Sequence, residues 1–234
     1  MKNSTAIACL LVFFWSLNCF GQQISETDFS IGISKAKAPE KINYWQEAKP
    51  VYLFMKGSKN WYNDEEKLSL RKEAGLNLQY ANISHSTSSN ALGGFNEKTG
   101  TVISLLINAA LQARYRITDS WAVGAGPEAE LLLLGYNNID DYYTRIYIPS
   151  QPPSSSHTSE KGINRNYFKK PSYGIKISLF QSQADASTTL GLHFSYLWTK
   201  SEHSSFFASN YVRFGLSIGF KKKQKETVSD VPEQ

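Results

Sequence analysis

The chain has 234 residues, with 25 Lys and Arg against 20 Asp and Glu, and a mean hydropathy of −0.37. Its modest positive charge is spread along the chain without a basic block before the C-terminal tail, so nucleic-acid binding is not suggested. No apolar stretch after residue 21 is long enough for a membrane helix. This excludes a helical membrane protein and leaves a β-sandwich or a β-barrel with a polar lumen.

The first 21 residues have the form of a secretory signal peptide. The charge of Lys2 precedes an apolar run over residues 6–17, and the small residue Gly21 closes the segment. The run covers only 12 residues, whereas a spanning helix needs roughly 20, so a transmembrane anchor is the weaker interpretation. We therefore expect cleavage after Gly21 and a mature chain that begins at Gln22.

Both cysteines, Cys9 and Cys19, lie inside this segment, so the expected mature chain has neither a thiol nor a disulfide. Its stability must then come from the fold alone. A lipoprotein signal at Cys19 is an alternative that Asn18 disfavours, because Gly or Ala normally precedes a lipidated cysteine. Without Lys2, 24 Lys and Arg remain against 20 acids, a net charge of +4.

Alternation of apolar and polar residues begins near the expected mature N-terminus. Residues 29–33 and 51–56 form two short alternating patterns. A stronger pattern runs over residues 68–80, where apolar positions alternate with Arg, Glu, Asn and Gln. Lys72 interrupts its apolar side, and we expect this residue near an end of a membrane-facing band.

The longest alternating pattern covers residues 101–117. Its odd positions are apolar from Ile103 to Ile117, and its even positions include Asn108, Gln112, Arg114 and Arg116. A helical repeat would mix these polar side chains into the apolar side. The pattern therefore predicts a long strand, with ends that project beyond a membrane or become irregular.

The next strand starts after the turn-forming residues 118–120. Two long strands joined by so short a connection form an antiparallel hairpin. The polar side of this hairpin carries Arg114 and Arg116 on the first strand and Glu128 and Glu130 on the second. This arrangement suggests charge pairs inside a narrow lumen, with a solvated sheet face as the alternative.

Three further alternating segments follow, at residues 173–179, 190–198 and 211–220. Their apolar sides are too apolar for water, so lipid is the simplest surrounding. The total is eight segments, an even number as a closed single-chain barrel requires. The sequence thus predicts an all-β transmembrane antiparallel up-and-down β-barrel. The alternative is a soluble periplasmic β-sandwich that binds a ligand and buries the odd side of residues 103–111.

The connections indicate which barrel end faces the periplasm. The short ones, expected there, are 118–120 and 182–187, and the long ones, expected outside, are 84–101, 137–170 and 200–210. We expect 137–170 to be a mobile external loop, because its Asn, Asp, Pro and Ser content cannot bury a core. Residues 57–67 fit less well, since this expected periplasmic connection is about eleven residues long.

Aromatic residues gather at the expected strand ends, where an interfacial girdle would lie. They are Trp121, Tyr136, Tyr196, Trp198 and Tyr211. Each one alone is more often explained by packing, but their common position predicts a girdle.

The hairpin ARYRITDSWAVGAGP of residues 113–127 resembles the PorT-like outer-membrane β-barrel family, as do YGI at 173–175 and LGLHFSY at 190–196. The segment YVRFGLSIGF at 211–220 is similar to the aromatic-ended last strand by which outer-membrane barrels are recognised for assembly. The resemblance covers roughly residues 29–220 and implies the bacterial outer membrane, with its lipid and the barrel-assembly machinery as partners. It implies no chemistry.

Three regions follow from these patterns. They are a signal peptide at 1–21, an outer-membrane β-barrel domain at 22–220 and a charged periplasmic tail at 221–234. The tail extends past the aromatic end of the last strand, which departs from barrels that stop there.

One pair of residues resembles a catalytic arrangement. His193 and Ser195 lie two positions apart, as in the His-x-Ser of outer-membrane lipid A deacylases, where a histidine activates a serine nucleophile. The alternation, however, directs both side chains into the lumen, away from a lipid substrate. Two small polar lumen residues are therefore the preferred interpretation.

Other candidate sites are weaker. His85, His157 and His203 are widely spaced and lack a paired Cys or His, so no metal site is indicated. Glu128 with Glu130, or Asp140 with Asp141, could form an acid/base pair, but charge neutralisation and solvation explain them better. No phosphate-binding glycine loop is present, so nucleotide use is not indicated.

Two functions of different classes remain. The first is a non-enzymatic barrel that serves as a structural or partner-binding component, through external loops or the C-terminal tail, with a PorT-like link to secretion or surface assembly. The second is a lipid A deacylase-like hydrolase that uses His193 and Ser195. We favour the first and expect no catalytic, cofactor-binding or metal-binding residues.

Overall fold

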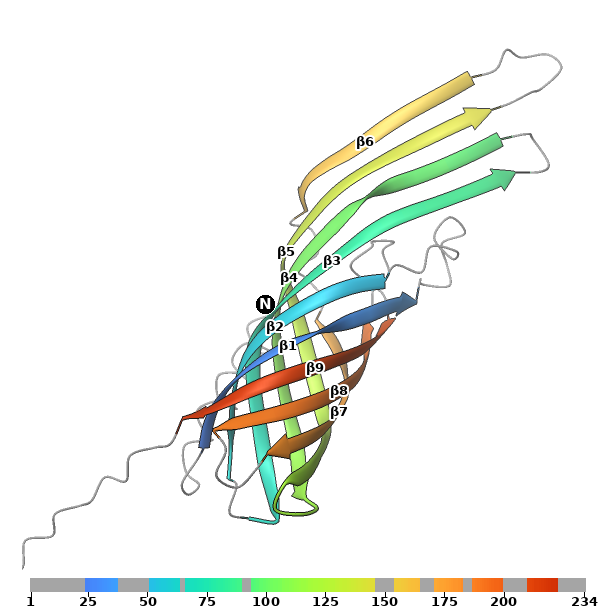
Figure 1. Ribbon diagram of the computed structural model, residues 1–234. Coiled ribbons are helices and arrows are strands. Elements are labelled where there is room, and N and C mark those ends of the chain that lie inside the picture. The colour runs from blue at the N-terminus through green and yellow to red at the C-terminus, as the bar shows by residue number, and fades with distance from the viewer. Residues whose placement is uncertain are drawn as a thin grey trace, which may run out of the picture.

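The computed structural model describes residues 24–37, 51–63, 66–89, 94–145, 154–164, 171–182, 187–199 and 210–222. These residues form nine β-strands (Figure 1). In chain order the strands are β1 (Ile24–Lys37), β2 (Val51–Tyr62), β3 (Leu68–Ser89), β4 (Gly94–Arg116), β5 (Trp121–Arg145), β6 (Ser154–Asn164), β7 (Ser172–Ser182), β8 (Thr188–Thr199) and β9 (Asn210–Lys222). Within the described part of the chain, no helix is long and apolar enough to cross a membrane.

Eight of these strands form a closed barrel. Strands β1 to β5 pair antiparallel in chain order, β5 pairs with β7, and β7, β8 and β9 continue the series. The barrel closes because β1 also pairs with β9, from Ser25 opposite Lys222 to Lys37 opposite Asn210. Closure gives every barrel strand two neighbours, as a sheet in lipid requires. The predicted eight-stranded antiparallel up-and-down barrel is confirmed.

Apart from a bulge in β5, side chains alternate between the lumen and the outer surface of the barrel, because successive residues of a strand point to opposite faces. On β7 and β9 the lumen-facing residues are buried and the outward ones are mostly exposed. The outward side of β4 includes Ile107, which is 42% exposed. The β-sandwich alternative is therefore wrong, since a second sheet would have buried this side.

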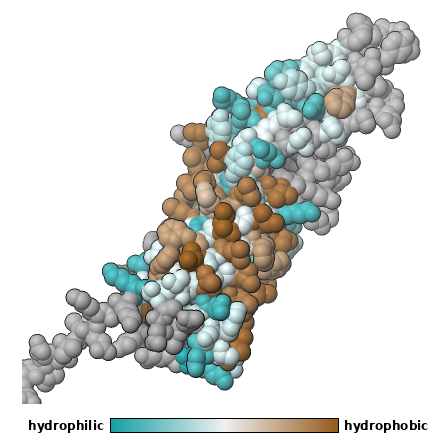
Figure 2. All heavy atoms as spheres, in the orientation of Figure 1, coloured by the Kyte–Doolittle hydropathy of each residue, from teal (hydrophilic) through white to brown (hydrophobic). Residues whose placement is uncertain are grey.

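The outer surface of the barrel is a continuous apolar band. Figure 2 shows apolar residues gathered around the middle of the molecule, with hydrophilic residues towards both ends. Large outward side chains in this band are Phe29, Ile31, Leu53, Met55, Leu70, Leu76, Ile107, Ile175, Ile177, Phe194, Phe214 and Leu216. An exposed apolar surface of this extent is stable in lipid rather than in water.

One end of the barrel, the turn end, carries the short connections 63–67, 117–120 and 183–187. At the tightest of them, Thr118 Oγ1 accepts a hydrogen bond from the backbone N–H of Trp121 at 3.1 Å. The expected long connection 57–67 is wrong, because β2 continues to Tyr62 and pairs with β1 along its whole length.

Lysines accompany aromatic residues on the outer surface at this turn end. Lys59 lies 5.7 Å from the ring centroid of Trp61, and Lys67 lies 5.5 Å from that of Tyr115. Lys72, whose place near an end of the band stays a prediction, is opposite Trp61 in the ladder. Such pairs place an ammonium group in water while the aromatic ring meets the edge of the lipid.

The opposite end differs from the prediction, because strands replace two of the expected long loops. Beyond the apolar band, β3 continues to Ser89, β4 starts at Gly94, β5 continues to Arg145, and β6 pairs with β5 from Gly135 to Arg145. We call residues 82–89, 94–101, 138–145 and β6 the extension; Figure 1 shows it rising from the barrel as one curved sheet. The polar side chains of this region did not prevent strand pairing, because neighbouring strands satisfy the backbone groups.

A register shift between Leu105 and Leu106 of β4 marks the base of the extension. Leu105 is opposite Leu134 and Leu106 is opposite Leu132, so Leu133 is an extra residue in β5. A bulge of this kind reverses which face each later residue of β5 occupies and bends the strand. Above the bulge the even positions of β5, such as Tyr136 and Tyr142, therefore face outward.

Several predicted regions lie wholly or partly outside the described residues. They include the signal peptide at 1–21, which lies wholly outside, and the tail at 221–234 and the connection 200–210, which lie mostly outside. The last strand runs two residues beyond Phe220, since Lys221 and Lys222 pair with Glu26 and Ser25 of β1. The first and last strands thus start and end together at the turn end.

Candidate functional site

The barrel lumen buries many charged side chains of both signs. Among the described residues, five carboxylates and five cations face it, each at most 5% exposed. They are Glu26, Asp28, Glu73, Glu128 and Glu130, with Lys56, Arg71, Arg114, Lys176 and Arg213. Charges buried to this extent require partners, so their pairing shows how the lumen is filled.

Glu73 of β3 lies between two lysines from opposite sides of the barrel. Lys176 of β7 donates to its Oε2 at 2.6 Å, and Lys56 of β2 donates to Oε1. The contact between Glu73 and Lys176 crosses the lumen, because β3 and β7 are not neighbours in the sheet. Ion pairs therefore occupy the middle of the barrel.

Glu130 of β5 forms the most extensive polar contacts in the lumen. Arg213 of β9 binds it in a bidentate manner, with Nη1 and Nη2 at 2.6 and 2.9 Å. Asn77 donates to it at 3.1 Å, and the Tyr211 hydroxyl is a further donor. Planar bidentate pairs are the strongest charge-assisted hydrogen bonds, so this cluster ties β3, β5 and β9 together across the barrel.

Glu128 connects the two clusters. Asn108 donates to its Oε1 at 2.6 Å, and the same oxygen lies 3.6 Å from Lys56 Nζ and 3.7 Å from Arg213 Nη1. The clusters around Glu73 and Glu130 are thereby joined into one network.

Towards the turn end the lumen is filled by guanidinium groups and aromatic rings. Arg71 donates to Glu26 at 2.8 Å and lies 4.2 Å from the ring centroid of Phe180. Tyr62 lies between Arg71 and Arg114, with the two guanidinium carbons 5.1 and 4.8 Å from its ring centroid. Flat groups in contact leave little free volume in this layer.

The lumen contains ion pairs, as predicted, but the predicted partners of the hairpin glutamates were wrong. Glu128 is opposite Ala110 in the ladder, whereas Arg114 is opposite Gly124, four residues further along β4. Four residues of a strand span about 13 Å, which is too far for an ion pair. Glu128 is instead near Lys56 and Arg213, which come from strands distant in sequence.

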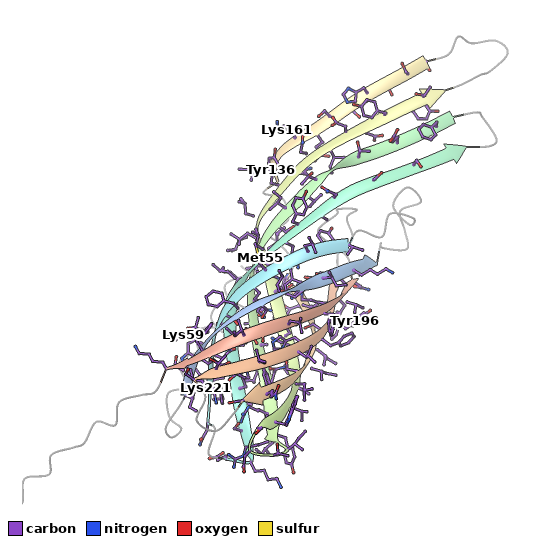
Figure 3. The ribbon with its side chains drawn as sticks, viewed as in Figure 1. Met55, Lys59, Tyr136, Lys161, Tyr196 and Lys221 are labelled. Carbon is purple, nitrogen blue, oxygen red and sulfur yellow. The ribbon has the colours of Figure 1, made fainter. Side chains whose placement is uncertain are left out.

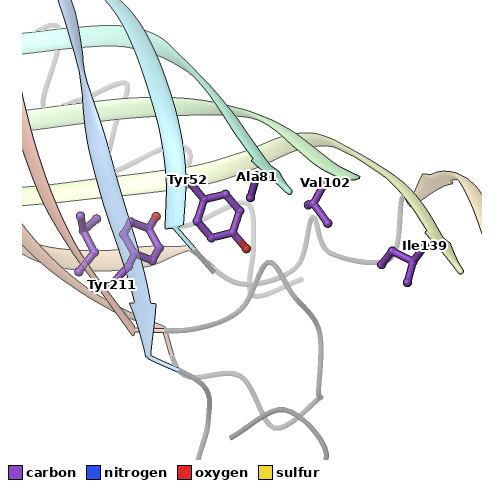
Figure 4. Close-up of a cluster of buried hydrophobic side chains, with 6 residues drawn as sticks. Tyr52, Ala81, Val102, Ile139 and Tyr211 are labelled. Atoms are coloured by element: carbon purple, nitrogen blue, oxygen red, sulfur yellow. The ribbon is translucent and has the colours of Figure 1, made fainter. Parts of the chain in front are cut away.

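An apolar layer covers the network where the extension begins. Figure 4 shows this cluster, which consists of Tyr52, Ala81, Val102, Ile139, Leu197 and Tyr211, each at most 7% exposed. Tyr211 was predicted as a girdle residue, and this is wrong, because it points inward and donates to Glu130. Its neighbour Val212 faces outward, so an aromatic residue at a strand end does not by itself indicate the lipid face.

The other predicted girdle residues lie on the outer surface. Trp121, Tyr196 and Trp198 are 39%, 42% and 39% exposed, and Tyr196 and Trp198 contact one another. Tyr136 is half-buried at the base of the extension (Figure 3).

His193 and Ser195 both face the lumen, at 7% and 2% exposure. His193 is engaged elsewhere, with Nδ1 at 2.9 Å from Ser178 Oγ and Nε2 at 2.6 Å from Ser217 Oγ. Both ring nitrogens are thus occupied by other serines, and Gln112 also donates to Ser178 at 2.8 Å. A buried amide and hydroxyl network of this kind supports packing of the lumen better than attack on a lipid.

We expect Ser195→Ala to leave the acylation of cellular lipid A unchanged. A hydroxyl hydrogen bond is worth about 0.5 to 1.5 kcal/mol, so the loss of barrel stability is modest, whereas loss of a nucleophile abolishes covalent catalysis. Mass spectrometry of lipid A from cells with the gene, without it and with Ser195→Ala makes the comparison. Loss of an acyl chain only in cells with intact Ser195 would establish the hydrolase.

The remaining histidines form no metal centre among the residues that the structure describes. His157 lies in the extension, where its Nε2 is 3.2 Å from Asp140 Oδ1 and its ring stacks on Tyr142. His85 belongs to β3, and His203 lies outside the described residues. Sequence patterns did not reveal the contact of His157 with Tyr142, because it depends on the pairing of β5 with β6.

Comparison with known proteins gave likenesses of structure only. No protein family model and no curated protein sequence matches the chain. Among solved structures, it is similar to Ail, the attachment invasion locus protein of Yersinia pestis, with 13% identity, coverage of 85% of this chain and 99% of that chain, and a TM-score of 0.32. Neisserial surface protein A has 8% identity, coverage of 86% and 97%, and a TM-score of 0.39.

The N-terminal β-barrel domain of Pseudomonas aeruginosa OprF gives a similar result. It has 12% identity, coverage of 86% of this chain and 100% of that chain, and a TM-score of 0.33. The assignment of this chain as a closed eight-stranded barrel rests on its own strand pairing.

Proposed function

We propose that the chain is an integral β-barrel of a bacterial outer membrane that lacks catalysis and serves as a structural or partner-binding component. The observation that carries this proposal is a closed barrel with an apolar outer surface and a lumen filled by paired charges. Single-chain barrels with an even number of antiparallel strands, an apolar outward band and short turns at one end are typical of outer membranes.

The filled lumen argues against transport. The layer of Arg71, Tyr62 and Phe180, the charged network around Glu73 and Glu130, and the apolar layer follow one another along the barrel axis. An eight-stranded barrel has room for little beyond its own side chains. Contacts with partners must therefore be made by the parts outside the apolar band.

A PorT-like role in secretion or surface assembly is the finer form of this proposal. It is supported by the sequence resemblance of the hairpin at 113–127 and of the last strand, whose apolar side ends in Phe220. Outer-membrane lipid and the barrel-assembly machinery are the expected partners in the membrane. The extension and the charged tail are the candidate contacts with a further envelope protein.

The proposal requires the extension outside the cell and the turn end in the periplasm. The expected mature chain has no cysteine, so single cysteines can be labelled uniquely. We expect a membrane-impermeant maleimide to label Thr144→Cys of the extension in intact cells. Asp119→Cys at the turn end is the matched control, because the structure places both residues at exposed positions.

Asp119→Cys labels only after the outer membrane is opened, if the proposal is correct. Labelling of both variants in intact cells, or the reverse order, contradicts the topology. Two further measurements are independent checks. In gel electrophoresis, a closed barrel migrates differently before and after boiling. In cell fractionation, recovery of the chain in the periplasmic fraction would contradict membrane insertion.

A further inference from the structure

Strand β6 ends the strand order of the described sheet, so one of its edges is open. We propose that it binds an extended segment of a second protein at the cell surface by strand addition, with an aromatic side chain of that segment against His157. The inference rests on the proposed function in one respect, namely that the extension lies outside the cell. It goes further by assigning one edge, one binding mode and one kind of partner.

The first observation is the unpaired side of β6. This strand pairs with β5 through eleven residue pairs, and it ends the strand order of the sheet, so no described strand lies on its other side. Residues 154–161 are all exposed. A free edge presents a row of backbone donors and acceptors that an extended chain can pair with.

Within the described residues, the edge has few of the features by which proteins prevent such pairing. The sequence of β6, SSSHTSEKGIN, contains no proline, and its charged residues are Glu160 and Lys161. Its first half consists of small hydroxyl residues and His157, which allow another backbone to approach closely. Natural sheets usually protect long free edges with proline, several charges or a covering loop, so the exposure of β6 is informative.

The second observation identifies the side chain that the edge accepts. Tyr142 of β5 is opposite His157 of β6, and the two rings are stacked with centroids 4.2 Å apart and planes inclined by 9°. The rings stack along the direction that crosses the strands, because they come from neighbouring strands. The other face of the imidazole therefore points to the open edge, and half of the His157 side chain is exposed.

An aromatic side chain on an added strand would continue this stack. Neighbouring strands lie about 4.8 Å apart, which matches the spacing of stacked rings. Asp140 of β5 orients His157, because its Oδ1 lies 3.2 Å from Nε2 of the imidazole. The aromatic partner would thus meet a ring that is already oriented.

A second position adds charge complementarity. Lys161 lies on the same face of β6 as His157, four residues further along, and its neighbour on β5 is the neutral Asn138. Figure 3 shows Lys161 on this outermost strand. An antiparallel segment with an acidic residue four positions before its aromatic residue would therefore match both sites.

A synthetic peptide with the sequence of residues 135–145, carrying Asp in place of Asn138, serves as the probe. This peptide has the natural neighbour of His157, Tyr142, and an acid for Lys161. We expect it to bind the full chain folded in lipid nanodiscs, measured by fluorescence anisotropy. Removal of the stacking ring, by Tyr142→Ala in the peptide or His157→Ala in the protein, weakens binding about 2- to 10-fold.

The double combination identifies direct stacking. On His157→Ala protein, the Tyr142→Ala change in the peptide has no further effect if the two rings meet. Ser155→Ala is the matched protein control, since this residue lies on the same face of β6 outside the proposed aromatic and acidic contacts, and it leaves binding unchanged.

N-methylation separates strand addition from surface adsorption. The donors of a strand point alternately to its two sides, so methylation of either the odd or the even residues of the peptide abolishes binding, while the other pattern preserves it. Equal binding of both methylated peptides, no binding of the parent peptide, or full binding by His157→Ala protein overturns the inference. Self-association of the chain through β6, seen as a dimer in nanodisc-free detergent that Thr158→Pro or Ser159→Pro abolishes, would assign the edge to a second copy and overturn it as well.

These outcomes are distinct from those of the topology test. If Thr144→Cys is labelled on intact cells but the peptide does not bind, only the inference fails. If the peptide binds the purified chain but labelling places the extension in the periplasm, the proposed orientation fails and the partner cannot be a cell-surface protein.

Discussion

Glu130→Leu is expected to lower the free energy of unfolding of the barrel by about 3 to 5 kcal/mol. The carboxylate receives two hydrogen bonds from Arg213 and others from Asn77 and Tyr211, in a lumen where Glu130 is 2% exposed. Its removal leaves the Arg213 guanidinium buried without its main counter-charge, and that uncompensated charge is the physical cause of the loss. Urea titration in lipid vesicles, read by heat-modifiable gel mobility, gives the free energy.

The double variant Glu130→Leu with Arg213→Met is the matched control. It removes both charges of the pair, and we expect it to regain most of the lost stability, because apolar groups of similar volume replace a buried ion pair at little net change. A double variant as unstable as Glu130→Leu alone would show that the loss comes from packing and not from the unpaired guanidinium.

Ile177→Arg is expected to lower the free energy of unfolding in lipid by about 2 to 4 kcal/mol. Ile177 lies near the middle of β7, faces outward and is 52% exposed, opposite Ala125 and Phe194 of the neighbouring strands. The guanidinium would be placed in hydrocarbon, where it lacks the hydration it has in the unfolded chain. The same urea titration in vesicles measures the effect.

Ile163→Arg is the matched control for this charge. Ile163 is 55% exposed and belongs to β6, opposite Tyr136 at the base of the extension. A charge near an interface costs about 0 to 1 kcal/mol, so the two arginine variants differ clearly if the apolar band is the lipid surface. Equal effects of the two variants would contradict the assignment of Ile177 to the membrane and of β6 to water.

The barrel strands were predictable because alternation is a local property. Ile175 and Ile177 face lipid and Lys176 faces the lumen, because successive side chains of a strand point to opposite faces. This alternation does not depend on which strands are neighbours. The pattern therefore gave the number of barrel strands and the orientation of His193 and Ser195 before any pairing was known.

The sequence did not predict the extension, because strands in lipid and strands in water have different sequence patterns. Inside the band, a strand must be apolar on one side, which is visible as alternation. In water both faces of a strand are polar, as at residues 154–161, and such a segment has the composition of a loop. Residues 154–164 become a strand because they pair with β5, which extends beyond the band together with β3 and β4. The composition of the segment does not encode these backbone hydrogen bonds.

The partners of the lumen charges depended on closure in the same way. Composition indicated that Glu128 and Glu130 need cations, but the nearest ones in sequence, Arg114 and Arg116, were the wrong choice. Arg213 reaches Glu130 across 83 residues because the barrel brings β9 to face β5. Tyr211 turned inward for the same reason, since strand parity, and not its place at a strand end, decides its face.

Local alternation therefore determined the barrel, its inner and outer faces and the polar character of its lumen, because each depends only on a residue and its neighbours in the chain. Closure of the sheet decided which buried charges meet, and pairing beyond the membrane decided that β6 exists and that one of its edges is free. These features depend on which strands become neighbours. That pairing is made by backbone hydrogen bonds, which depend little on the type of side chain.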